Sequence, residues 1–234
     1  MVFGLSEVDE ARLILACKHG SDRGAELVRW SLEATLPNFR LLASQGMLDH
    51  VEGCDHTTVF YWDNTLEYHL IRTRNVEKLR ILLDRQTEYT DPSMLRVAIH
   101  YPDAEDDTTM LKVLLDDYPH LVDLNARSAA THKLPHFQQT TMLMRAAEHC
   151  RHRSIGVLLE HGADVNAETL GGWTALHILV YYWIRRLYTL SDYQRCVIAL
   201  QDAGARDIGF QIDLNDPEAN KHRLDEIIRA ARAE

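Results

Sequence analysis

Two helix starts of the same kind stand 33 residues apart in this chain. The segments 141–147 (TMLMRAA) and 174–180 (TALHILV) each begin with a threonine followed by apolar helix formers, and Ala147 precedes Val180 by 33 residues. A threonine in this position is typical of a helix N-cap, because its hydroxyl accepts a hydrogen bond from a first-turn amide. Two matching helix starts at this distance make a candidate internal repeat.

The residues between the two starts complete one unit. Segment 154–160 (SIGVLLE) has the wide apolar stripe of a helix that is packed on two sides. Gly162 is expected to take the left-handed conformation that closes a helix end. The stretch 163–167 (ADVNA) reads as extended chain with turn-forming Asp and Asn, and 171–172 (GG) permits a tight turn. The order is therefore helix, short link, helix, loop and then the next helix.

Composition limits the class of partner. The 234 residues hold 25 Lys and Arg against 35 Asp and Glu, a formal net charge of −10. Nonspecific attraction to nucleic-acid phosphates needs a basic excess, so we expect no nucleic-acid partner. No run of about 18 apolar residues occurs, so we expect no membrane span.

The first residues and the cysteines favour a reducing compartment. Residues 1–13 (MVFGLSEVDEARL) lack the basic segment and the apolar core of a secretory signal. Cys17, Cys54, Cys150 and Cys196 lie far apart without a CxxC pair, so a disulfide framework is not expected. Cysteines within helical patterns are usually small core residues. We expect a cytoplasmic location, with the nucleus as the alternative.

Residues 174–177 (TALH) and 157–167 (VLLEHGADVNA) resemble the ankyrin repeat. That family's unit is a turn and two antiparallel helices of about 33 residues. The resemblance is close over 140–180 and looser over the rest of the chain. It implies an all-α fold, an ankyrin-repeat solenoid of stacked helix-turn-helix units with an insertion and a C-terminal capping helix.

The resemblance also implies the organisation of the chain, a single divergent ankyrin-repeat domain over residues 1–234 with about five repeats. A half-polar terminal helix is what the open end of such a stack needs. The expected parts are a first helix pair at 9–36, an insertion at 37–62, repeats at 64–89 and 93–127, an extended loop at 128–139, repeats at 140–170 and 171–207, and the capping helix at 216–233.

Contacts in ankyrin stacks are usually made on a concave face, lined by the inner helices and the finger-like turns. Carried onto this sequence, that face implies a row rich in histidine and aromatics, with the 128–139 loop beside it. For the aromatic side chains, packing within the core is the alternative explanation. His177, at the family's TxLH position, is implied to hydrogen-bond the neighbouring turn. The candidate binding residues are His19, Arg72, Thr73, His100, Tyr101, His132, His136, Phe137, Trp173 and Tyr181.

The histidines in this row open a second interpretation, in which the groove holds a small molecule or is a cofactor-independent enzyme. Histidine serves as acid or base near neutral pH. His149 would be the general acid or base, Glu148 or Tyr182 its neighbour, and Arg72 an anion partner. No GxSxG, P-loop or GxGxxG motif follows a strand, so the reactions would be isomerisation, cyclisation, dehydration or hydrolysis.

No metal and no cofactor are expected. Segments 54–56 (CDH) and 149–152 (HCRH) contain ligand residue types at short spacing. Neither has the paired CxxC or HxxxH pattern of a zinc site.

Two functions therefore remain open. The first is a binding module that presents a concave groove to a protein partner, and the acidic net charge favours a partner with a basic patch. The second is a small-molecule site or an enzyme whose groove is closed by the 128–139 loop. Recovery of a protein partner from native extract supports the first, whereas loss of turnover on replacing His149 and His132 supports the second.

Overall fold

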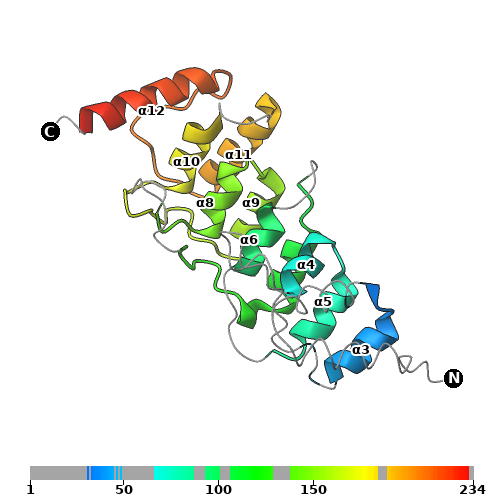
Figure 1. Cartoon of the computed structure of the whole chain (residues 1–234). Helices are drawn as coiled ribbons and strands as arrows, with labels where there is room; N and C mark the ends of the chain where they lie inside the picture. The colour runs from blue at the N-terminus through cyan, green and yellow to red at the C-terminus, as the bar shows by residue number, and fades with distance from the viewer. Residues whose placement is uncertain are drawn as a thin grey trace, which may run out of the picture. The chain divides into compact units, whose positions relative to one another are not determined.

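The computed structural model describes residues 31, 33–44, 46, 48, 66–86, 93–100, 106–128, 138–183 and 189–231. Every regular element within these ranges is a helix (Figure 1). Backbone contacts divide the chain into two compact units, residues 1–97 and 98–234, each with its own set of packed helices. The single domain over 1–234 stays a prediction.

The helices of the first unit pack around α5 (Val76–Leu83). Both α3 (Leu36–Ser44) and α4 (Leu66–Arg72) lie against it. Asn75 caps α5, since its side chain accepts a hydrogen bond from the Lys78 amide at 3.2 Å. The contact is apolar, because all three helices contribute fully buried side chains: Phe39, Leu42, Leu66, Leu70, Leu79 and Leu83.

A buried lysine ties α5 to the chain before α3. Lys78 is 5% exposed, and its Nζ donates a hydrogen bond to the Ser31 carbonyl at 2.9 Å. The same Nζ lies 5.3 Å from the centroid of the Phe39 ring. Burial lowers the pKa of this ammonium, because removal from water penalises the charged form. Lys78 thus joins two segments 47 residues apart through one polar contact inside an apolar cluster.

The boundary between the two units falls within α6 (Ser93–His100), whose Leu95 and Ile99 are fully buried. The next helix, α7 (Thr109–Lys112), continues without a break as the π-helix η1 (Val113–Asp117). A single 3-10 turn, η2 (Pro119–Leu121), follows.

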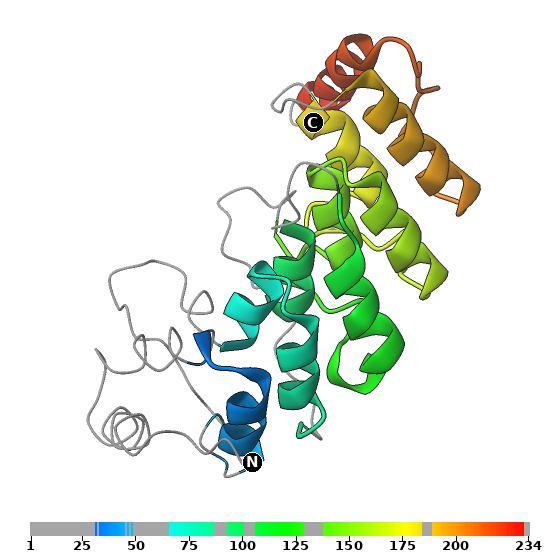
Figure 2. The same cartoon turned by 90° about the vertical axis from the view of Figure 1, so that its right-hand side faces the viewer.

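The second unit is built from two helix pairs whose members pack in rows (Figures 1 and 2). The first pair is α8 (Met142–Glu148) with α9 (His152–Glu160), and the second is α10 (Ala175–Tyr182) with α11 (Leu190–Asp202). Helix α8 lies against α10, and α9 lies against α11 and α7. We call α8 and α10 the inner row and α7, α9 and α11 the outer row. Serial packing of helix pairs is what the 33-residue period predicts.

The ends of these helices follow from single residues. Thr141 caps α8, because its Oγ1 accepts a hydrogen bond from the Met144 amide at 3.4 Å. Gly162 closes α9 with a φ of +87°, so that the Ala163 amide reaches the Leu158 carbonyl at 3.0 Å. The prediction of a left-handed Gly162 is confirmed, and the arrangement is a glycine-closed helix end.

Cys150 and Cys196 are core residues, as predicted, although Cys150 lies in the turn between α8 and α9 and only Cys196 is in a helix. They are 5% and 0% exposed. A hydrogen bond with Cys150 together with burial raises the pKa of the Cys196 thiol far above its usual value. Since the thiolate is the reactive form, the Cys196 thiol behaves as a packing residue at neutral pH.

A buried carboxylate joins the chain before α7 to the start of α9. Asp106 is 5% exposed, and its Oδ2 accepts a hydrogen bond from the Arg153 amide at 2.6 Å. Its Oδ1 accepts a hydrogen bond from the Ser154 hydroxyl at 2.7 Å. An anion at the first turn of a helix is favoured by the free amides and by the helix dipole. Asp106 therefore caps α9 from a position 47 residues earlier in the chain.

A histidine links the ends of two outer-row helices. His161 lies 2.7 Å through Nδ1 from the Val157 carbonyl and 2.8 Å through Nε2 from Oδ1 of Asp116 in η1. Both partners are acceptors, so both ring nitrogens donate only when the imidazole is protonated. The carbonyl of Val157, followed by the carboxylate of Asp116, raises the pKa of His161 against the opposing effect of desolvation.

We expect this contact to make stability depend on pH. A folded-state pKa above the unfolded value gives stabilisation that is complete below about pH 6.5 and is lost as the pH rises through the folded pKa. The advantage of the wild-type protein over His161→Gln in urea unfolding should therefore be larger at pH 6 than at pH 8.5. Asp116→Asn should reduce this pH dependence. An advantage that is the same at both pH values would contradict the assignment.

The last helix, α12 (Pro217–Ala231), packs against α10 and is joined to α11 by a buried amide. Asn220 is fully buried, and its Nδ2 donates hydrogen bonds to Tyr193 Oη at 3.1 Å and to the Asp213 carbonyl at 2.6 Å. Its Oδ1 accepts a hydrogen bond from the Asp213 amide at 2.8 Å. Burial raises the pKa of Tyr193 to about 12. The helix is thus held by specific polar contacts as well as by Leu224, which is 2% exposed.

Candidate functional site

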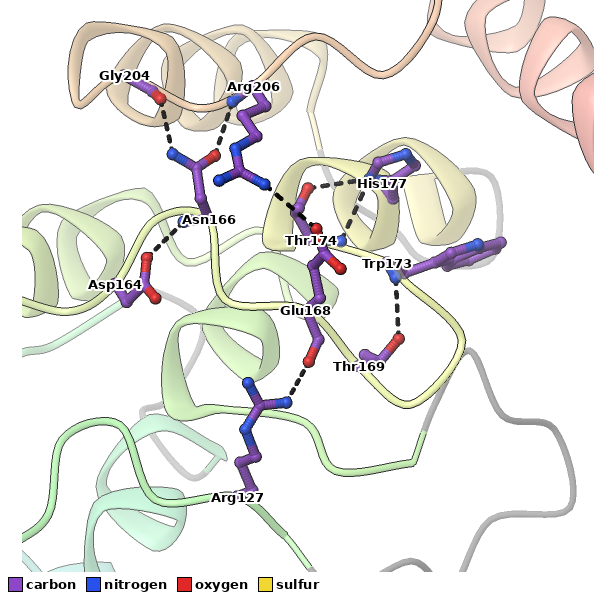
Figure 3. A network of polar contacts seen from close by, with 10 residues as sticks. All are labelled: Arg127, Asp164, Asn166, Glu168, Thr169, Trp173, Thr174, His177, Gly204 and Arg206. Carbon is purple, nitrogen blue, oxygen red and sulfur yellow. Dashed lines mark hydrogen bonds and ion pairs between the residues drawn. The ribbon is translucent and has the colours of Figure 1, made fainter.

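The loops of the second unit are tied to one another by asparagine side chains, of which Figure 3 shows Asn166. Asn125 Oδ1 accepts a hydrogen bond from the Asp164 amide at 2.9 Å. One loop further on, Asn166 Oδ1 accepts from the Arg206 amide at 2.8 Å, and its Nδ2 donates to the Gly204 carbonyl at 3.0 Å. Each asparagine therefore links its own loop to the loop that follows.

The asparagines are held in place by aspartates two residues earlier. The Asn125 amide donates a hydrogen bond to Asp123, and the Asn166 amide donates to Asp164, as expected of Asx turns. A third copy at 213–215 has the same contact at 2.9 Å. Sequence reasoning missed this copy, although the same three letters, DLN, occur at 123–125.

Arginines on both sides fix the middle of the loop between α9 and α10. Arg127 donates a hydrogen bond to the Glu168 carbonyl, and the Arg206 guanidinium lies 3.4 Å from the Glu168 carboxylate. The pair with Arg206 is exposed, so its own contribution is about 0–1 kcal/mol. Together the two contacts fix the position of Glu168, because Arg127 reaches it from the preceding loop and Arg206 from the following one (Figure 3).

The tip of this loop presents a large apolar side chain to solvent. Leu170 is 58% exposed. The turn beneath it is closed by the Thr169 amide, which donates to the Trp173 carbonyl at 2.8 Å, and by the Trp173 amide, which donates to Thr169 Oγ1 at 3.0 Å. Gly172 takes a φ of +77°, a conformation that side-chain-bearing residues rarely adopt. Leu170 therefore stands on a fixed turn.

An aromatic row continues from the loop along α10. Trp173 is stacked with His177 at a centroid distance of 6.1 Å and meets Tyr181 edge to face at 5.2 Å. Tyr181 also meets Tyr182 at 5.3 Å. Residues four apart share a helix face, which explains the alignment of His177 and Tyr181, whereas Trp173 precedes the N-cap Thr174 and meets them from the loop. Trp173 is buried, whereas His177, Tyr181 and Tyr182 are half-buried.

The row ends at α12. The Lys221 ammonium lies 5.5 Å from the centroid of the Tyr181 ring and 2.5 Å from the Asp225 carboxylate. Lys221 and Asp225 are four residues apart on α12, the spacing of a helical ion pair.

His177 bonds within its own helix end. Its Nδ1 lies 2.9 Å from Thr174 Oγ1 and 3.2 Å from the Thr174 amide, so the imidazole accepts from the amide and completes the cap of α10. The resemblance implies a hydrogen bond to the neighbouring turn, whereas the hydrogen bonds found at Nδ1 go to Thr174, the N-cap of the same helix.

The structure brings three of the residues proposed from the sequence together: Trp173, Tyr181 and Tyr182. Glu148 and His149 occupy the positions on α8 that precede Tyr181 and Tyr182 by 33 residues. Glu148 forms an ion pair with Arg145 at 2.8 Å, and His149 is 6% exposed.

The other proposed residues belong to different parts of the chain. Arg72 and Thr73 are exposed at the end of α4, where Thr73 Oγ1 donates a hydrogen bond to the His69 carbonyl at 2.7 Å. His100 is the last residue of α6, and its side chain is not among those described. The remaining candidates lie outside the described residues: His19, Tyr101, His132, His136 and Phe137.

In the part of the chain that the structure describes, no three His, Cys, Asp or Glu side chains converge in the manner of a metal site. Among the same residues, no helix combines the length and apolarity that crossing a bilayer requires.

Paired helices joined by asparagine-linked loops define a helical repeat protein. The family profile for ankyrin repeats in many copies matches residues 143–182, the segment that contains α8, α9 and α10. Residues 143–182 are therefore assigned to the ankyrin-repeat family, and every regular element among the described residues is a helix, as the resemblance predicted.

Two solved structures are similar to this chain. One is the ankyrin repeat domain of Bcl-3, described as a unique member of the IκB protein family, with 21% identity over 93% of this chain and 97% of that one, and a TM-score of 0.48. The other is an ankyrin repeat domain from Acinetobacter baumannii AYE, with 17% identity, 82% and 96% coverage, and a TM-score of 0.48. A comparison with curated proteins gave no match.

Proposed function

We propose that this protein is a binding module that holds a protein partner against the loop and inner-row side of its second unit. The proposed contact surface, called here the loop–aromatic surface, consists of Leu170, His177, Tyr181 and Tyr182, and the buried Trp173 packs against His177 and Tyr181. Ankyrin repeats typically mediate protein interactions, and this surface contains the aromatic residues that commonly dominate interface energies. We propose a cytoplasmic or nuclear location for the interaction. In the first unit, Arg72 and Thr73 are proposed as further contacts.

The exposure of Leu170 is the observation that carries this proposal. A leucine 58% exposed at the tip of a turn contributes little to the core, so folding alone gives no reason for it. The turn is held by hydrogen bonds within itself and by a contact from the Leu170 amide to the Gln138 carbonyl at 3.1 Å. An apolar side chain on a rigid support loses little conformational entropy when a partner covers it.

The environment of the catalytic candidates also favours binding over catalysis. Glu148 is engaged by Arg145, and His149 is buried, so neither presents a free acid or base to the surface. An enzyme built on His149, Glu148 and Tyr182 remains the alternative proposal from the sequence. It would be supported by turnover that is lost in His149→Ala.

The test is quantitative capture from native extract with the full chain, followed by cross-linking to locate the contact. Replacing Leu170 with Asp should reduce capture of the cross-linked partner about tenfold, which is the effect of removing one interface anchor. Ile198→Asp is the matched control, because Ile198 is 44% exposed on the outer-row helix α11. Equal capture by the two variants, or no partner above background with the wild-type chain, would remove the basis of the proposal.

A further inference from the structure

The aromatic row ends at a ring that already holds a cation. Tyr181 lies under the Lys221 ammonium at 5.5 Å, within the distance at which a positive charge is attracted to the face of an aromatic ring. The Tyr181 ring makes angles of 62° with Trp173 and 77° with Tyr182. Tyr181 is therefore held between two steeply inclined neighbouring rings.

The cation over Tyr181 belongs to Lys221, which is also paired with a carboxylate. Lys221 contacts the Asp225 carboxylate at 2.5 Å on the same helix, and its side chain is 21% exposed. If another cation covered Tyr181, Lys221 would keep its ion pair with Asp225. The exchange would therefore leave no buried charge unpaired, which is the usual obstacle to such a substitution.

We propose that the partner held by the loop–aromatic surface places an arginine side chain on Tyr181, in exchange for Lys221. This inference rests on the proposed function and names the chemistry of its partner, a segment that combines an apolar contact for Leu170 with a guanidinium group. Arginine is favoured over lysine because a planar guanidinium is less strongly hydrated and stacks on aromatic rings. The net charge of −10 adds long-range attraction for a basic segment.

The test uses two short peptides of the form Gly-Ser-X-Ser-Gly with blocked ends. In one X is arginine, and in the other X is citrulline, which has the same shape without the charge. Binding to the full chain is followed through the NMR signals of the Tyr181 ring, assigned with Tyr181→Phe. The arginine peptide should bind at least about threefold more tightly than the citrulline peptide, the range of an exposed cation–π contact.

Two charge-matched variants separate the Tyr181 site from general electrostatics. Lys221→Gln removes the internal competitor and should raise the affinity for the arginine peptide about twofold or more beyond the rise in Lys112→Gln. Lys112 is exposed on α7, so its replacement changes the net charge equally. Equal affinities of the two peptides, or equal effects of the two lysine variants, would overturn the inference.

Failure of this inference is distinguishable from failure of the proposed function. If Leu170→Asp loses partner capture but the two peptides bind equally, the binding module is supported and the arginine contact is refuted. If the arginine peptide binds threefold more tightly but the chain captures no partner, the cation site at Tyr181 is supported and the binding module is refuted.

Discussion

Asp106→Ala is expected to lower the free energy of unfolding of the 98–234 unit by about 2–4 kcal/mol, because two donors at the start of α9 lose a charged acceptor. The two donors are the Arg153 amide, in a part-buried contact, and the hydroxyl of the fully buried Ser154. Urea unfolding followed by circular dichroism measures the change. Asp106→Asn keeps one acceptor oxygen and should lose about half as much.

The control for Asp106 removes the same charge without a buried contact. Asp202 is exposed in the last turn of α11, and Asp202→Ala should change stability by no more than about 0.5 kcal/mol. An Asp106→Ala protein as stable as this control would show that α9 starts equally well without the carboxylate. The assignment of Asp106 as the cap of α9 would then be wrong.

Asn220→Ala is expected to detach α12 while leaving the helix pairs before it folded. The change removes three hydrogen bonds, to Tyr193 and to both backbone groups of Asp213, at a cost of about 2–4 kcal/mol. In a stack whose units contact only their neighbours, such a loss at one end stays local. Amide exchange should become fast in residues 217–231 and stay slow in α8 and α9.

The phenol of Tyr193 provides a second readout for α12. Burial raises its pKa to about 12, whereas an exposed tyrosine titrates near the usual value of 10. Detachment of α12 should therefore lower the pH at which one phenol, that of Tyr193, ionises in a titration followed by ultraviolet absorbance. Tyr193→Phe in the same background identifies the signal, and a retained high pKa in Asn220→Ala would contradict the role of Asn220. His222→Ala, at an exposed position of α12, should leave both readouts unchanged.

Local signals in the sequence were sufficient for the helix pairs. Thr141 and Gly162 act through residues two to four positions away, so their roles were readable from the chain alone. The aromatic row was readable in part, because positions 177 and 181 share a helix face whatever lies around them. The copy of the Asx turn at 213–215 was equally local and was missed.

Contacts between distant segments were beyond such reasoning. Asp106 lies in an acidic stretch that reads as a solvated link, yet it is buried at a helix start 47 residues later. Lys221 lies on a helix expected only to cap the stack, and it contacts a ring of α10. Glu148 was proposed for catalysis, and its carboxylate is held by Arg145 one turn away.

The sequence by itself determined that this chain makes paired helices at an ankyrin period, because caps, glycine stops and apolar spacing act within one or two turns. Only the tertiary structure decided which polar groups are buried and which aromatic and apolar side chains remain at the surface. The physical reason is that burial depends on what packs against a residue, and in a stack of repeats that neighbour comes from another unit of the chain.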